Sequence, residues 1–210
     1  MIIDPSKRFN SIKDYPKTTI LYHSKRYNPI ISEIPVSKDF HIEDAEVGCT
    51  ETHKRMVENY FKGSRFFINV GACGAISSGL KIGDIVEATS VLCSSGFSNF
   101  FGYGDILFCR KKFPEIIDVC TQCVPTMYYE KTDIHKEADC IEQESEAVLV
   151  TVRWLNEKYG RKMGACGCAN LFYISDIIDR NEWIDTLKLQ DSRNIYRKDV
   201  LFSALHIYDR

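Results

Sequence analysis

The sequence predicts an α/β protein with a single domain that spans residues 1–210. Short β-rich runs, such as residues 18–22, alternate with stretches in which apolar residues recur at helical spacing, such as residues 139–159. Strands that alternate with helices favour a three-layer α/β/α sandwich. A chain of 210 residues suits one hydrophobic core, since a single core serves chains of up to roughly 250 residues.

A strand and a helix are predicted in the first part of the chain. Residues 18–22, T-T-I-L-Y, form the strand, and a polar segment follows it. Residues 50–61 show helical spacing, with Thr50 or Thr52 as the N-cap and Gly63 as the stop. This helix leads directly into the next predicted strand.

A glycine-containing unit follows and is the most informative part of the sequence. Residues 66–70 and 82–91 are predicted strands, and Gly71 and Gly74 between them predict a turn. Such a turn places backbone amides beside a small ligand, here those of Gly71, Ala72, Cys73 and Gly74. The unit lacks the G-x-G-x-x-G spacing of dinucleotide folds and the G-K-[ST] sequence of a P-loop, so we exclude both.

The second half of the chain predicts a long loop and two helices. Residues 94–104 are rich in glycine, serine and aromatic residues, and long loops of this kind often line a site. A helix is predicted over residues 139–159, ending at Gly160. A final helix is capped by Asp191 or Ser192.

A buried strand is predicted between these two helices. Residues 163–175 are rich in small and apolar residues, and this strand would present Ser175 and Asp176 at its carboxyl end. In open α/β sheets the carboxyl ends of the strands face the ligand crevice. We therefore expect both side chains to lie near a binding site.

Composition and charge limit the class of partner. The chain is 44% hydrophobic and 27% charged, with a formal net charge of −2, so it offers no basic field for nucleic acid or an anionic membrane. No apolar run approaches roughly 18 residues, and the first residues lack the apolar core of a signal peptide. We expect a cytoplasmic protein whose partners are small molecules or copies of itself.

The cysteines indicate reduced thiols and no metal site. Nine cysteines are scattered along the chain, unlike the compact framework of a small secreted protein. Cys120-x-x-Cys123 and Cys166-x-Cys168 lack the paired histidines or second C-x-x-C motif of a zinc site. We expect no metal and no cofactor.

Three short motifs, in the expected order, carry a resemblance to a known family. V-G-A-C-G-A at residues 70–75, followed by L-K-I-G-D-I-V, is similar to a nucleotide-site segment of the nucleoside phosphorylase and nucleosidase superfamily. I-E-Q-E-S-E-A at residues 141–147 resembles its x-E-M-E-[SA]-A element, and I-S-D at residues 174–176 resembles its V-S-D element. The resemblance, which includes purine nucleoside and uridine phosphorylases, implies a central mixed, barrel-like sheet flanked by helices. It also implies a nucleoside or nucleobase ligand and a homo-oligomer, such as a dimer or trimer of dimers.

The resemblance implies roles for individual residues. Asp176 matches the general acid that protonates the departing base, and Glu144 matches the residue that holds the ribose hydroxyls. Gln143 and Ser175 lie within the same motifs.

The resemblance also implies residues around the base. Gly96 and Ser98 match a G-x-S element that shapes the base pocket, and Tyr128 and Tyr129 resemble an F-Y pair that stacks on base or sugar. We expect the neighbouring Glu142 and Glu146 to form a solvated acidic face.

The sequence departs from the family where phosphate would bind. Asn69 and Ala72 occupy positions at which many phosphorylases carry an arginine and a serine or threonine, and the early G-D-P-x-R loop is missing. Lys25 or Arg26 could supply the positive charge that phosphate requires. An arginine typical of the uridine-specific branch is also absent near Cys93, which favours a purine.

Four functions follow from these residues. The first is phosphorolysis of a nucleoside at a rearranged phosphate site, with inorganic phosphate as co-substrate. The second is a nucleosidase that uses water, and the third is a nucleoside-binding or storage protein without turnover. The fourth, which no family supports, is a cysteine enzyme in which Cys73 is activated by His53 or His135.

Overall fold

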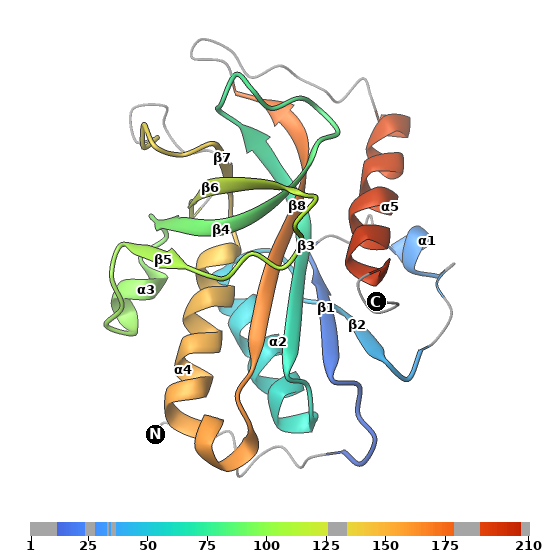
Figure 1. Ribbon diagram of the computed structural model, residues 1–210, viewed down its shortest axis with the longest axis vertical. Coiled ribbons are helices and arrows are strands. Elements are labelled where there is room, and N and C mark those ends of the chain that lie inside the picture. The colour runs from blue at the N-terminus through green and yellow to red at the C-terminus, as the bar shows by residue number, and fades with distance from the viewer. Residues whose placement is uncertain are drawn as a thin grey trace.

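The computed structural model describes residues 12–23, 28–32, 34, 37–125, 134–178 and 190–206. Within them lie eight strands and five helices (Figure 1). The strands are β1 (Thr18–Tyr22), β2 (Phe40–Asp44), β3 (Phe66–Ala75), β4 (Ile85–Cys93), β5 (Ile106–Phe108), β6 (Ile117–Cys123), β7 (Cys140–Glu142) and β8 (Gly167–Ile177). The helices are α1 (Asn28–Ile31), α2 (Cys49–Lys62), α3 (Phe97–Phe100), α4 (Ser145–Met163) and α5 (Gln190–His206).

The strands form one mixed sheet that closes on itself. Its order is β2-β1-β3-β7-β6-β4-β5, and β8 pairs with both β3 and β4. The pairs β3–β8, β4–β6 and β6–β7 are parallel, whereas β3–β7 and β4–β8 are antiparallel. These pairings close a ring of five strands. The predicted barrel-like sheet is therefore confirmed.

Helices cover the sheet on two sides. Figure 1 shows α2 and α4 side by side on one side and α5 with α1 on the other. Phe67 of β3 packs into a core shared with α2 and α4, whereas its neighbour Ile68 packs into a core shared with α5. Because successive strand residues point to opposite faces, the sheet must be apolar on both. The three-layer α/β/α prediction is confirmed.

The first predicted strand and the helix after it are found close to their expected places. The strand spans Thr18–Tyr22, and α2 ends at Gly63, whose φ of 145° favours glycine. The helix begins earlier than expected, because Gly48 is its N-cap in place of Thr50 or Thr52.

The predicted glycine turn is wrong. β3 continues through Gly71 and Gly74 to Ala75, with an irregularity between Cys73 and Gly74 in its register with β8. Neither glycine has a positive φ. Both allow close packing, since a Cβ on Gly71 would lie 3.2 Å from the Phe172 ring and one on Gly74 would lie 2.7 Å from a methyl of Ile178. The turn comes later, and β4 begins at Ile85.

Several other helices and strands begin or end at residues that differ from the predicted ones. The helix predicted over residues 139–159 is two elements, β7 and α4, and α4 continues past Gly160 to Met163. The strand predicted over residues 163–175 is β8, Gly167–Ile177. The loop at 94–104 contains the short helix α3, and α5 already begins at Gln190.

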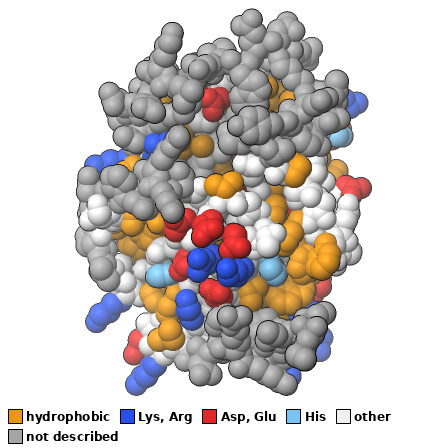
Figure 2. All heavy atoms as spheres, turned by 180° about the vertical axis from the view of Figure 1, so that it is seen from behind, with side chains coloured by type: hydrophobic (Ala, Val, Ile, Leu, Met, Phe, Trp, Pro, Cys, Tyr) orange, Lys and Arg blue, Asp and Glu red, His pale blue; other side chains and the backbone are white. Residues whose placement is uncertain are grey.

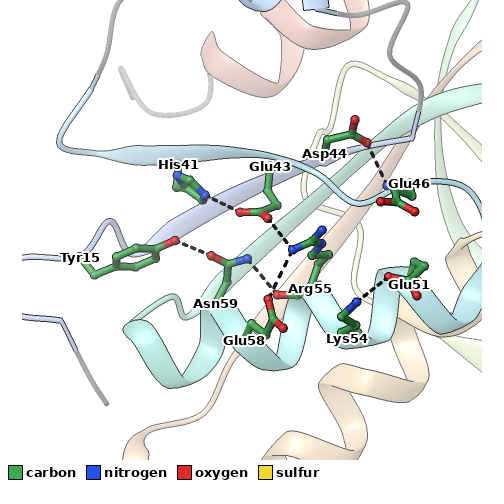
Figure 3. A network of polar contacts seen from close by, with 10 residues as sticks. All are labelled: Tyr15, His41, Glu43, Asp44, Glu46, Glu51, Lys54, Arg55, Glu58 and Asn59. Atoms are coloured by element: carbon green, nitrogen blue, oxygen red, sulfur yellow. Dashed lines mark hydrogen bonds and ion pairs between the residues drawn. The ribbon is translucent and has the colours of Figure 1, made fainter. Parts of the chain in front are cut away.

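Ion pairs tie the edge strand β2 to α2. Arg55 of α2 lies 3.5 Å from carboxylate oxygens of both Glu43 on β2 and Glu58, and the ring of His41 lies 2.7 Å from the Glu43 carboxylate (Figure 3). Figure 2 shows basic and acidic side chains gathered together near the centre of one face. Charged side chains on an edge strand disfavour its pairing with a second chain.

None of the described helices is both long and apolar enough to cross a lipid bilayer.

Gly83 provides a test of how α5 is attached to the sheet. Its φ is 93°, and a Cβ there would lie 2.5 Å from the Tyr196 ring of α5. We expect Gly83→Ala to lower the free energy of unfolding by roughly 1 to 3 kcal/mol, because it combines backbone strain with overpacking. Urea denaturation measures this. Gly104→Ala is the matched control, since a Cβ at Gly104 meets no atom within 4 Å. Equal effects of the two substitutions would contradict the packing.

Candidate active site

The candidate site is built around the junction between β7 and α4. Glu142 is the last residue of β7, and its carboxylate accepts hydrogen bonds from the backbone N–H groups of Glu144 at 2.6 Å and Ser145 at 2.8 Å, and from the Ser145 hydroxyl. A carboxylate in this place binds N–H groups that have no partner within the helix. Glu142 is buried, so the solvated acidic face predicted for it is wrong.

Burial also changes the protonation of Glu142. Burial and, to a smaller extent, the nearby Glu144 carboxylate raise the pKa of this carboxyl from 4.5 to about 7. The hydrogen bonds from Ser145 and Glu144 lower it, because they stabilise the ionised form.

Glu144 links α4 to the segment before α2. It is the N-cap residue of α4 and is 5% exposed. Its Oε1 accepts a hydrogen bond of 3.2 Å from the backbone N–H of Gly48, which is 96 residues away in sequence. Gly48 is in turn the N-cap of α2. The carboxylate therefore lies where the starts of two helices meet.

Glu146 links α4 to the loop after β4. Its carboxylate accepts hydrogen bonds from the Ser95 backbone N–H at 3.1 Å, the Ser95 hydroxyl at 2.7 Å and the Ser98 backbone N–H at 2.6 Å. The side chain is fully buried, so the solvated position predicted for it is also wrong. This carboxylate holds Gly96 and Ser98, the predicted base-pocket residues, against α4.

A cavity of about 440 Å³ opens between these segments. It is lined by Val47, Gly48, Cys49, Thr50, Glu51, Ser95, Gly96, Phe97, Phe100, Pro125 and Gln143. Its volume is in the range of small-molecule sites, as is the mixture of apolar and polar groups. None of these described lining residues is a lysine or arginine.

Asp176 lies on the other side of β3. It is the register partner of Gly74, whose neighbour on the opposite side is Ile141 of β7. Neighbouring strands lie about 4.8 Å apart, so Asp176 is about 10 Å across the sheet from Ile141. The end of β3, with Gly71, Ala72, Cys73 and Gly74, therefore separates the two predicted catalytic segments.

Ser175 fixes the surroundings of Asp176. Its hydroxyl lies 2.5 Å from Oδ2 of Asp176 and 3.3 Å from the backbone carbonyl of Cys73. Ser175 is buried, whereas Asp176 is partly exposed and Ala72 is exposed. At the end of β8 the Asp176 carboxylate is thus partly open to solvent, and Ser175 lies within the sheet.

The proposed cysteine enzyme finds no support in this arrangement. The Cys73 thiol is buried and points to the Tyr173 carbonyl, and burial raises its pKa well above the usual value. His53 contacts the Thr151 hydroxyl at 2.8 Å, and burial lowers its pKa to about 4. The backbone of His135 donates to Gln122. A protonated thiol is a poor nucleophile.

Asn69 is held in the core of the sheet. Its carboxamide contacts Nε2 of His23 and donates to Oδ1 of Asn170 at 3.1 Å, while Nδ1 of His23 lies 2.6 Å from the Glu46 carbonyl. Asn69 and Asn170 are fully buried. The residue at the position of the phosphorylase arginine is therefore part of a structural chain of hydrogen bonds.

Four predicted site residues, Lys25, Arg26, Tyr128 and Tyr129, lie outside the described residues. The remaining ones form two groups: Gln143 and Glu144 with Gly96 and Ser98 at the start of α4, and the β3 glycine segment with Ser175 and Asp176. Sequence analysis missed Gly48 and Cys49, and it indicated Ser95 only as part of the loop at residues 94–104, which does line the cavity. Gly48 directly before a helix was the available signal, since glycine is tolerated as an N-cap. Among the described residues, no group of His, Cys, Asp and Glu side chains could hold a metal ion.

The fold is shared with known enzymes. The chain superposes on the 5′-methylthioadenosine/S-adenosyl homocysteine nucleosidase of Campylobacter jejuni with a TM-score of 0.70 and 15% identity, covering 91% of this chain and 98% of that one. For the uridine phosphorylase of Vibrio fischeri the TM-score is 0.67 and the identity 14%, over 98% and 93% of the two chains. For the futalosine hydrolase of Helicobacter pylori the TM-score is 0.66 and the sequence identity is 14%, and the superposition covers 93% of this chain and 98% of that one.

These matches confirm at the level of the fold the resemblance to nucleoside phosphorylases and nucleosidases. At this level of identity the likeness establishes the architecture, and residue roles have to be argued from the site itself. No family model matches the chain, and no curated protein matches it.

The raised pKa of Glu142 predicts a pH-dependent stability difference. The folded state binds a proton more tightly than the unfolded state between pH 4.5 and about 7, so wild-type stability falls as pH rises through this window. Glu142→Gln removes the titration. We expect the free energy of unfolding of the variant, relative to that of the wild type, to increase by up to roughly 3 kcal/mol as the pH rises from 4.5 to 8. Urea denaturation at several pH values measures this, with the exposed Glu137→Gln as control. A difference that does not vary with pH would refute the assignment.

Proposed function

We propose that this protein cleaves the N-glycosidic bond of a nucleoside, with a purine favoured as the base. The observation that carries the proposal is the placement of two carboxyl groups on opposite sides of the glycine segment of β3. Asp176 lies on β8 to one side, and β7 on the other side leads into Glu144 at the start of α4. The fold is shared with nucleosidases and a phosphorylase, which is consistent with this chemistry.

Two carboxyl groups suit the two charges that develop during the reaction. Positive charge grows on the ribose as the glycosidic bond breaks, and an ionised Glu144 stabilises it while binding the ribose hydroxyls. Negative charge grows on the departing base, and Asp176 neutralises it by sharing a proton with a base nitrogen. Ser175 orients the Asp176 carboxyl through its 2.5 Å contact.

The cavity beside α4 supplies room for the nucleoside. Phe97 and Phe100 offer aromatic faces, and Gln143 offers an amide. Aromatic side chains stack favourably on flat rings, and amides pair with their edges. Glu146 fixes this wall by holding Ser95 and Ser98.

We propose water as the attacking group. Phosphate binds where positive charge and several donors converge, but the described lining of the cavity has no lysine or arginine, and Asn69 is engaged in the core. Phosphorolysis is the second candidate, and it requires Lys25 or Arg26 to supply the charge.

A panel of purine and pyrimidine nucleosides, each with and without inorganic phosphate, tests the proposal. Hydrolysis predicts free base and free ribose at a rate independent of phosphate. Ribose 1-phosphate as the product would favour phosphorolysis. Binding detected by calorimetry with no base released would identify a binding protein and overturn both enzyme proposals.

Substitutions at the two carboxylates test their separate roles. We expect Asp176→Asn to reduce kcat at least 100-fold, because general acid catalysis contributes roughly 10² to 10⁴. Glu144→Gln should lower kcat/KM to a similar extent, with a larger loss for ribonucleosides than for analogues without the ribose hydroxyls. Glu157→Gln, on the exposed face of α4, is the control. Wild-type rates in either site variant would refute the role assigned to that residue.

A further inference from the structure

We propose that Cys49 and Cys123 form a redox-sensitive dithiol at the wall of the cavity, which a peroxide converts into an intramolecular disulfide. The two Sγ atoms lie 4.0 Å apart, although the residues are 74 positions apart in sequence. Cys49 is the first residue of α2 and Cys123 the last of β6. The fold therefore brings the two thiols together.

The two thiols differ in their access to solvent. Cys49 is partly exposed and lines the cavity, whereas Cys123 is fully buried. A small oxidant can therefore reach Cys49 through the cavity, and Cys123 lies directly behind it. This is the arrangement expected of an attacking thiol and a resolving thiol.

Nearby thiols are less well placed to react. Cys93 is the register partner of Cys123, but its thiol points to the carbonyl of Val91 on its own strand, 3.7 Å away. Cys73 interacts with Cys140, but both are buried and neither lines the cavity. The Cys73–Cys140 pair is therefore a natural control, close together but inaccessible.

The chemistry balances with hydrogen peroxide as the oxidant. The Cys49 sulfur attacks one peroxide oxygen, the O–O bond breaks, and a sulfenic acid and one water form. Burial raises the pKa of the Cys123 thiol well above its usual value, so its proton passes to the departing oxygen as its sulfur attacks the sulfenic sulfur. The S–O bond breaks, and a second water leaves. In total the two thiols lose two electrons and two protons, and one peroxide is reduced to two waters.

Disulfide formation would alter the site. The sulfurs must approach from 4.0 Å to about 2.05 Å. Cys49 now donates to the Gln143 carbonyl at 3.3 Å and contacts the Ser95 hydroxyl at 3.5 Å, and the residue before it, Gly48, donates to Glu144. Moving the Cys49 sulfur weakens these contacts. The resulting loss of nucleoside turnover rests on the proposed function, whereas the disulfide itself does not.

Peptide mapping of the full-length chain tests the dithiol directly. The reduced protein is treated with hydrogen peroxide, the remaining thiols are alkylated, and the peptides are identified by mass spectrometry. We expect one disulfide, between Cys49 and Cys123, that dithiothreitol reverses. Cys49→Ser and Cys123→Ser should each abolish it, and Cys73→Ser should leave it intact. A disulfide at Cys93, or oxidation of Cys49 to a sulfinic acid with no disulfide, would overturn the proposal.

Turnover before and after oxidation tests the effect on the site. We expect at least a tenfold loss of kcat/KM on oxidation, restored by dithiothreitol, in the wild type and in Cys120→Ser, whose partly exposed thiol lies outside the cavity lining. In Cys123→Ser no resolving thiol traps the Cys49 sulfenic acid, so excess peroxide oxidises it to a sulfinic acid. Dithiothreitol does not reduce a sulfinic acid, and the loss of kcat/KM in this variant should not be restored. A mapped disulfide with an unchanged rate would refute the coupling to the site. A protein that turns over no nucleoside would refute the proposed function, and the peptide map would still decide on the dithiol.

Discussion

Three buried carboxylates at the start of α4 are the constraint on which the rest of the site depends. A buried carboxylate is unfavourable unless donors surround it, and here the donors come from the backbone: Glu142 binds the amides of its own helix start, Glu144 binds Gly48, and Glu146 binds Ser95 and Ser98. Glu142 therefore fixes the start of α4, Glu144 fixes the residue before α2, and Glu146 fixes the segment that contains α3. The cavity lies between the segments that they hold.

The other half of the site depends on small residues in the sheet. Gly71 and Gly74 let the Phe172 ring and Ile178 approach β3 more closely than any side chain would allow. The register of β3 with β8 changes at this place, and Asp176 follows the change. Close packing and a local irregularity thus position Asp176. In the neighbouring part of the sheet, a hydrogen bond between the side chains of Asn69 and Asn170 links β3 to β8.

The sequence predicted the layers of the fold and part of the site. Residues 18–22 and 50–61 carried clear local patterns, and the motifs around Glu144 and Asp176 correctly indicated the family of folds. The glycine turn was wrong because local patterns do not distinguish glycine that permits a turn from glycine that permits close packing. Glu142 and Glu146 were misjudged because their partners are backbone amides, and for Glu146 these lie about fifty residues away in Ser95 and Ser98. The Cys49–Cys123 contact could not be predicted for the same reason.

Amide hydrogen exchange at Ser95 and Ser98 tests most directly whether the α4 carboxylates hold the site together. Loss of a hydrogen bond to a charged group costs roughly 1.5 to 3 kcal/mol, which corresponds to a tenfold or larger change in exchange. In Glu146→Ala these two amides should exchange at least tenfold faster than in the wild type, while Asp199→Ala, at an exposed position of α5 on the other side of the sheet, leaves them unchanged. Unaltered exchange of both amides in Glu146→Ala would show that this carboxylate does not hold the Ser95–Ser98 segment against α4.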